Sequence, residues 1–233
     1  MTLGTAAMQV HDLPTALAHY DAALALDSLS YEASWRAAIA LLDEGAQIPD
    51  TAKSARRDTL YARAERLARR AVVADSMGAD GHFALAAAVG RAALTMGQRE
   101  RIRRAKIIRD EAQRAVALDP RHDGAWHILG RWNAEIMRLS GLSRFLAKKF
   151  LGAGIFGQAS WEAAVSDMQR AVALDPGRLY HRLELAEIYV DRKRYADARS
   201  ELAEVAGLPD REIMDSLYRR EAEELAAKIA DKQ

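Results

Sequence analysis

Six histidines and no cysteine limit the chemistry that this chain of 233 residues could carry. Without cysteine there is no disulfide, thiolate zinc site, iron–sulfur cluster or cysteine nucleophile. The histidines are His11, His19, His82, His122, His127 and His181. None of them belongs to a His-Glu-x-x-His pattern or to another metal-ligand spacing. His122 and His127, the closest pair, stand five residues apart and so do not share one face of a helix. We therefore expect no metal site.

Glycine-rich and acidic motifs do not form a catalytic site either. Gly152-Ala153-Gly154, followed by Gly157, is superficially similar to a phosphate-binding loop, but no strand precedes it, as dinucleotide binding requires. The pair Glu223-Glu224 falls in a strongly charged segment that is typical of a solvated helix face. No nucleophile, base and oxyanion donor can be assembled from the sequence. We expect a protein that is not an enzyme and that binds no cofactor.

Basic residues gather most densely at positions 99–106, Arg-Glu-Arg-Ile-Arg-Arg-Ala-Lys. Ile102, Ala105 and Ile108 give this run an apolar stripe, which predicts a helix with a cationic outer face. No stacking aromatics are interleaved, and 34 basic against 33 acidic residues leave a net charge of only +1. A solvated helix surface is therefore favoured, and we expect no nucleic-acid partner.

A second cationic segment, residues 142–151, is also apolar. Its spacing predicts an amphipathic helix of about three turns. The residues concerned are Leu142, Arg144, Phe145, Leu146, Lys148, Lys149 and Phe150. Packing over the rest of the molecule is favoured, because exposed apolar patches of this size are uncommon on monomers. The alternatives are a helix on a membrane surface and a partner-binding patch. The patch would use Arg144, Phe145, Lys148, Lys149 and Phe150.

The elements that position these side chains are repeated helices. Half of the residues are hydrophobic, with an excess of alanine, and strong helix formers dominate, which indicates an all-α chain. The phrase Gln-Arg-Ala-Val-Ala-Leu-Asp-Pro occurs twice, ending at Pro120 and at Pro176. Weaker copies surround Asp27 and Asp75. Such internal repetition predicts stacked helix hairpins.

We predict a single all-α domain over residues 1–233, an α-solenoid of about five hairpins. The first hairpin keeps mainly its second helix, near residues 13–26. The other predicted pairs are 31–43 with 52–74, 80–95 with 98–118, 123–139 with 160–174, and 179–192 with 195–206. Residues 140–157 form an insertion that contains the short amphipathic helix, and residues 211–230 form a C-terminal capping helix.

The pattern within the hairpins resembles the tetratricopeptide repeat, which places aromatic and small residues at fixed offsets. The residues that match the first helix are Trp126, Leu129 and Gly130. Those that match the second helix are Trp161, Ala164, Met168, Ala171 and Pro176. The small residues lie where the two helices are expected to cross.

Over roughly residues 80–209 the chain also resembles the regulator of microtubule dynamics family. Three segments carry the likeness, in matching order and spacing. They are Arg104-Ala105-Lys106-Ile107-Ile108 leading to Leu118-Asp119-Pro120, then Leu129-Gly130-Arg131-Trp132, then the insertion with Phe150-Leu151-Gly152 before Trp161-Glu162-Ala163-Ala164. The resemblance implies a non-enzymatic protein that binds other proteins. Because the Ala- and Arg-rich composition looks more bacterial than animal, tubulin is not the expected partner.

First helices line the concave face of such a solenoid, so we expect partner-binding residues on them. The candidates are Arg91, His127, Arg131, Glu135, Arg138 and Glu187. The Lys and Asn of a tetratricopeptide carboxylate clamp are absent from the matching positions. Asn133 stands on the packing stripe, where an aromatic is usual, and we predict that its hydrogen bond orders the insertion.

The sequence thus predicts a scaffold that binds a protein or peptide in its concave groove. The alternative is a peripheral membrane adaptor that uses residues 142–151. The first residues lack the features of a signal peptide, and no apolar stretch of about 20 residues could span a bilayer. We expect a cytoplasmic protein, with a periplasmic or exported location as the alternative if a signal peptide has been removed. The sequence does not indicate an oligomeric state.

Overall fold

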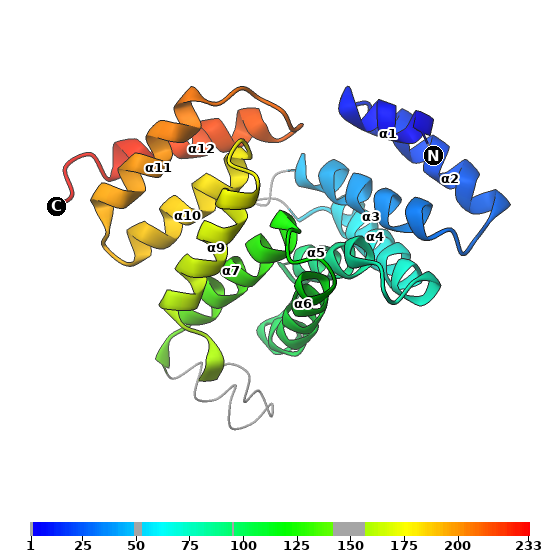
Figure 1. Ribbon diagram of the computed structural model, residues 1–233, viewed down its shortest axis with the longest axis horizontal. Coiled ribbons are helices and arrows are strands. Elements are labelled where there is room, and N and C mark those ends of the chain that lie inside the picture. Colours follow the sequence, from blue (N-terminus) through cyan, green and yellow to red (C-terminus); the bar gives the residue numbers. More distant parts are fainter. Residues whose placement is uncertain (1, 49–52, 95, 142–156) are drawn as a thin grey trace. The chain divides into compact units, whose positions relative to one another are not determined.

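A computed structural model describes residues 2–48, 53–94, 96–141 and 157–233 of the chain. Helices form the framework of these ranges, and no strand occurs in them (Figure 1). The prediction of an all-α fold built from helix hairpins is therefore confirmed. None of the described helices is both long and apolar enough to cross a membrane. Most of the predicted insertion, including all of residues 142–151, lies outside the described residues.

The chain divides into two compact units, Met1–Pro120 and Arg121–Gln233. The boundary falls at the end of the first full copy of the repeated phrase. Each unit is built from helix hairpins whose predicted bounds agree with the structure to within a few residues. The division does not test the prediction of a single domain, which stays a prediction.

Unit 1 contains three hairpins, in which α1 packs on α2, α3 on α4 and α5 on α6. The helices are α1 (Thr2–Gln9), α2 (Leu13–Leu26), α3 (Tyr31–Ala46), α4 (Ala55–Ala74), α5 (Ala79–Leu94) and α6 (Gln98–Leu118). Helix α1 completes the first hairpin, which the sequence predicted to keep mainly its second helix. The close approach of the two helices depends on Gly4, where an added Cβ would lie 2.5 Å from Cε1 of the buried Tyr20.

In the described part of unit 2, the helices form two hairpins and a last helix. The helices are α7 (Asp123–Arg138), α9 (Trp161–Leu174), α10 (Leu179–Asp191), α11 (Tyr195–Gly207) and α12 (Asp215–Lys228). Helix α7 packs on α9, and α10 packs on both α11 and α12. At the crossing of α7 and α9, a Cβ added to Gly130 would lie 2.9 Å from the backbone nitrogen of Met168. The predicted small residue at this crossing is therefore required by the packing.

The aspartate of the repeated phrase ends one helix and prepares the next. Asp27, Asp75 and Asp175 are the C-cap residues of α2, α4 and α9, each with a φ between −146° and −132°. Their carboxylates accept a hydrogen bond from the backbone N–H two residues on, at 2.8–3.2 Å. This Asx turn starts the connection to the following first helix. The ending recurs because these three hairpins leave their second helix in the same way.

Candidate functional site

Most of the predicted partner-binding residues lie on one face of unit 2. On α7, polar side chains recur every fourth residue from Asp123 and so share one side of the helix. Those of α10 face them. We call this surface the first-helix face. It comprises Asp123, His127, Arg131, Glu135 and Arg138 of α7, the N-cap residue Arg178 of α10, and Tyr180, His181, Glu184, Glu187 and Asp191 of α10.

One end of the face is a buried imidazole pair. Nδ1 of His127 lies 2.9 Å from Nδ1 of His181, and the residues are 6% and 1% exposed. Nε2 of His181 lies 2.9 Å from a carboxylate oxygen of Asp123, so that Nε2 must donate. A neutral imidazole has one N–H, so Nδ1 of His181 accepts the hydrogen bond from Nδ1–H of His127. His127 was expected to project from α7; instead it is buried, because α10 supplies a polar partner.

Asp123 anchors this end of the face. It also pairs with Arg178, whose Nη1 donates to Oδ2 at 2.8 Å, while Nε of Arg178 lies 2.8 Å from Oε1 of Glu212. Burial alone would raise the pKa of Asp123, but the His181 hydrogen bond and the Arg178 charge outweigh it and hold the pKa well below its usual range. Burial lowers the pKa of His181, and the carboxylate only partly opposes this. The pair is thus an ionised carboxylate beside neutral imidazole.

The middle of the face joins ionic and aromatic contacts. Nη1 of Arg131 lies 2.6 Å from Oε1 of Glu184, and it also donates to the Tyr180 hydroxyl. The charge of Glu184 raises the pKa of Arg131 further. The Tyr180 ring lies 4.5 Å from the His127 ring and 4.4 Å from that of Tyr218, between centroids. Because Tyr218 belongs to α12, the last helix continues the face.

At the other end of the face, one arginine contacts three carboxylates. Arg138 lies 2.7 Å from Glu135, 2.7 Å from Asp191 and 3.8 Å from Glu187. Burial would lower the pKa of Arg138, but Asp191 and Glu135 raise it. Glu187 has the weakest of the three contacts. Its own burial, followed by the charge of Glu184, raises its pKa to about 7.

The remaining predicted residues lie elsewhere. Arg91 is half-buried on α5 in unit 1. Asn133 is buried and donates to the carbonyl oxygen of Leu129 at 3.0 Å and to Asp167 of α9 at 3.2 Å. It therefore links the two helices of its hairpin, and any bond to the insertion falls outside the described residues. Burial raises the pKa of Asp167 to about 6, although the Asn133 hydrogen bond opposes this. The five residues of the predicted insertion patch, Arg144, Phe145, Lys148, Lys149 and Phe150, are also outside the described ranges.

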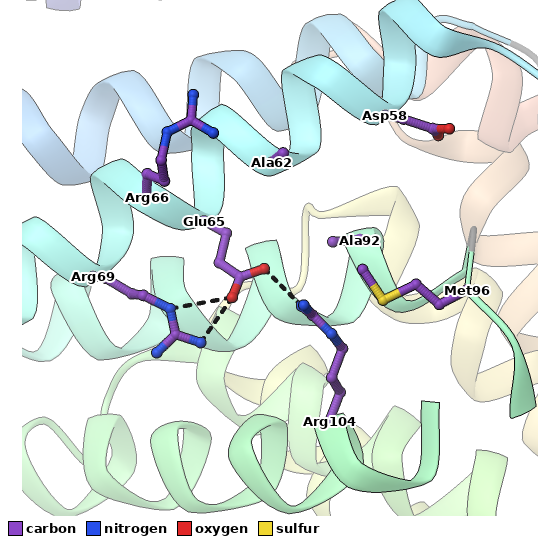
Figure 2. Close-up of a pocket in the computed structure, with 8 residues that line it drawn as sticks. All are labelled: Asp58, Ala62, Glu65, Arg66, Arg69, Ala92, Met96 and Arg104. Carbon is purple, nitrogen blue, oxygen red and sulfur yellow. Dashed lines mark hydrogen bonds and ion pairs between the residues drawn. The ribbon is translucent and has the colours of Figure 1, made fainter. Parts of the chain in front are cut away.

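Unit 1 contains a pocket of about 340 Å³ between α4, α5 and α6 (Figure 2). It is lined by Asp58, Ala62, Glu65, Arg66, Arg69, Ala92, Met96 and Arg104. Figure 2 shows Glu65 between two guanidinium groups, 2.7 Å from Arg69 and 2.6 Å from Arg104. Burial would raise the pKa of Glu65, but the two arginines lower it. Arg104 of the basic run is thus half-buried in an internal ion pair, whereas a solvated surface was expected.

The first-helix face is ionic and aromatic in character. It presents fixed charges and aromatic rings, and within the described ranges no group of three or more His, Asp or Glu side chains could hold a metal ion. The sequence did not predict seven residues of this face and of its continuation on α12: Asp123, Arg178, Tyr180, His181, Glu184, Asp191 and Tyr218. The four-residue recurrence of polar side chains in α7 was a visible signal for Asp123.

Consecutive helix hairpins with small residues at their crossings define a tetratricopeptide-like α-solenoid. The structure is similar to a thermophilic tetratricopeptide-repeat protein of Thermus thermophilus, with a TM-score of 0.67, 18% identity, and 97% of this chain and 96% of that chain covered. It is also similar to MamA, with a TM-score of 0.49, 17% identity, and 99% and 98% covered. YrrB, a tetratricopeptide-repeat protein described as having an unusual peptide-binding site, gives a TM-score of 0.46, 19% identity, and 93% and 88% covered.

The sequence identifies the family within this class. The profile of regulator of microtubule dynamics protein 1-3 matches residues 6–230, and the chain belongs to this family. The match includes the N-terminal third, where the sequence patterns indicated only generic repeats. A search of curated proteins finds no match.

Proposed function

We propose that this protein is a non-enzymatic interaction scaffold that binds a peptide or protein segment along the first-helix face of unit 2. The face lies on successive first helices, which correspond to the concave, partner-binding side of a tetratricopeptide solenoid. Its continuous array of charged and aromatic side chains from α7 through α10 to α12 is the observation that carries the proposal.

The ion pairs of the face support this proposal because they order its side chains before a partner binds. Arg131 contacts two side chains of α10, and Arg138 contacts carboxylates of both α7 and α10. Binding to side chains that are already ordered loses less conformational entropy than binding to mobile ones. Such a surface can recognise a segment without rearranging.

Photo-crosslinking can test where a partner binds. Peptides would first be selected from a random library on the full chain. They would then be irradiated with two variants that carry p-benzoylphenylalanine, one in place of Glu135 on the face and one in place of Glu223. Glu223 is exposed on α12. It stands two residues from Glu221, whose charge acts on Glu187 of α10, and so it lies on the opposite side of the helix.

We expect cross-linking at position 135 and none at position 223, with unfolding midpoints close to that of the unmodified chain. Equal cross-linking at both positions, or at neither while the peptides still bind, would contradict binding along the first-helix face. The alternative function, a membrane-surface role of residues 142–151, stays a prediction, as does the cytoplasmic location.

A further inference from the structure

The first-helix face carries more carboxylates than cations toward the C-terminal ends of α7 and α10. The ionic network there consists of Arg131, Glu135, Arg138, Glu184, Glu187 and Asp191. Four carboxylates against two guanidinium groups leave a net charge of −2 when all are ionised. Glu221 of α12 adds a further negative charge that acts on Glu187. The whole chain has a net charge of +1, so this excess of negative charge is local to the face.

Two of the four carboxylates are the most exposed groups of this network. The side chains of Glu135 and Glu187 are 45% and 42% exposed, while those of Arg131 and Arg138 are 34% and 27% exposed. A partner that approaches this end of the face therefore meets carboxylate oxygens before guanidinium groups. Surfaces of opposite charge steer association and exclude like-charged partners.

A buried carboxylate beside these groups is incompletely neutralised. Glu184 is 4% exposed, and its Oε1 is bound by Arg131. Its Oε2 is buried and has no hydrogen-bond partner among the described residues. A buried ionised oxygen without a donor is unfavourable. Its charge is one reason for the raised pKa of Glu187, one turn further along α10. Arg131 therefore satisfies only one of the two carboxylate oxygens of Glu184.

Aromatic rings lie near Glu184 of this network, because Tyr180 and Glu184 both contact Arg131. Tyr180 is half-buried and stacks on Tyr218 with an angle of 13° between the ring planes. The guanidinium of Arg131 lies 6.0 Å from the centre of the Tyr180 ring. Guanidinium and ammonium groups bind favourably where an aromatic face adjoins a carboxylate. Arg131 of this face already lies in such a place, near the Tyr180 ring and bound to Glu184.

We propose that the segment bound by the first-helix face is cationic, and that its lysine or arginine side chains bind at the exposed carboxylates of Glu135 and Glu187, beside Arg138. This inference rests on the proposed function, because it names the chemistry of the partner at the same surface. Anionic partners, including nucleic acid and acidic lipid headgroups, are disfavoured at this surface by the same charges.

The titration of Glu187 gives the binding a defined pH dependence. The groups that face it are Arg131, Glu135 and Arg138 of α7, Glu184 and Asp191 of α10, and Glu221 of α12. With a pKa of about 7, Glu187 is largely protonated at about pH 6 and largely ionised at about pH 8. A bound cation favours the ionised form, so affinity should rise over this interval.

The experiment uses the library-selected peptides as probes and measures their affinity for the full chain by fluorescence anisotropy. Glu187→Gln keeps the shape of the side chain and removes its charge, and Glu223→Gln is the matched control. We expect the selected peptides to be rich in lysine and arginine. We also expect Glu187→Gln to weaken them by about tenfold and to abolish the rise in affinity with pH, while Glu223→Gln leaves both unchanged.

The outcomes separate this inference from the proposed function. Peptides that cross-link at position 135 but have no basic excess, or that bind Glu187→Gln as tightly as the unmodified chain, overturn the cationic partner and leave the scaffold proposal standing. Peptides that bind without cross-linking at position 135 overturn the proposed face, and the cationic partner with it.

Discussion

The two units join neighbouring hairpins in different ways. In unit 1, Tyr31 at the start of α3 lies over Gly78 and Gly81, where an added Cβ would be 2.3 Å and 2.9 Å from its ring atoms. Its hydroxyl accepts a hydrogen bond from the Gly81 N–H at 2.9 Å. In unit 2, the corresponding helices α7 and α10 are joined by Asp123, His181 and the arginine–carboxylate pairs.

The difference shows what the repeated phrase leaves undetermined. Tyrosine against glycine buries apolar area and presents little charge to a partner. A polar interface requires desolvation of ions, which offsets much of their attraction, but it leaves ordered charges at the surface. The proposal of recognition by unit 2 rests on this difference between the first helices. Unit 1 has its own ion pair between hairpins, Glu65 of α4 with Arg104 of α6, but it joins second helices.

Removing the acceptor at the buried end of the unit 2 network should have the largest effect. Asp123→Ala leaves the Arg178 guanidinium and the His181 Nε2–H without their carboxylate. We expect a loss of about 3 kcal/mol in the free energy of unfolding, because the buried His181 N–H loses its acceptor and the half-buried Arg178 keeps only Glu212. Urea unfolding at neutral pH measures it. A loss below about 1 kcal/mol would mean that the network contributes little to joining α7 and α10.

Overpacking a tyrosine–glycine contact in unit 1 should have the next largest effect. A Cβ at Gly45 would lie 2.3 Å from Cε1 of the buried Tyr61. Gly45→Ala should lower the free energy of unfolding by about 1–3 kcal/mol, although alanine favours the helix. Gly207→Ala is the matched control, because an added Cβ there meets nothing within 4 Å. If both variants were as stable as the unmodified chain, packing of the Tyr61 ring would not require glycine at position 45.

Asp167 allows a smaller, pH-dependent test between α7 and α9. Its folded pKa is raised from 3.8 to about 6, so the folded state binds more protons than the unfolded state between these values. Stability therefore falls as pH rises through this interval. Asp167→Asn removes the charge and should gain about 1 kcal/mol above about pH 7, with no gain near pH 3. Urea unfolding at the two pH values measures it, and a gain of equal size at both would argue against titration of Asp167.

The helices and their order could be predicted from the sequence, because the signals for them are local. The Ala-Leu-Asp ending stops a helix and forms the Asx turn within a few residues. Gly130 could be placed at a helix crossing for the same reason, since the apolar stripe of α7 runs through it. The first helix, Thr2–Gln9, was missed because it is short and its packing depends on Gly4 under Tyr20.

The positions of several candidate-site residues could be predicted from the sequence, but their burial and their contacts could not. His127 and Arg131 were identified by their positions on α7, but the burial of His127 depends on His181, which stands 54 residues later. Arg138 was expected to be available to a partner, yet its charge is shared among carboxylates of both helices. Such contacts follow from how hairpins stack, and periodicity within one helix does not contain that information.

Hydrogen–deuterium exchange of the full chain, with and without a library-selected peptide, tests most directly whether a partner binds the first-helix face. We predict that the peptide slows amide exchange in α7, α10 and α12, while α3 and α5 of unit 1 exchange as in the free protein. Protection of α3 and α5 with no change in α7 and α10 would contradict recognition by unit 2.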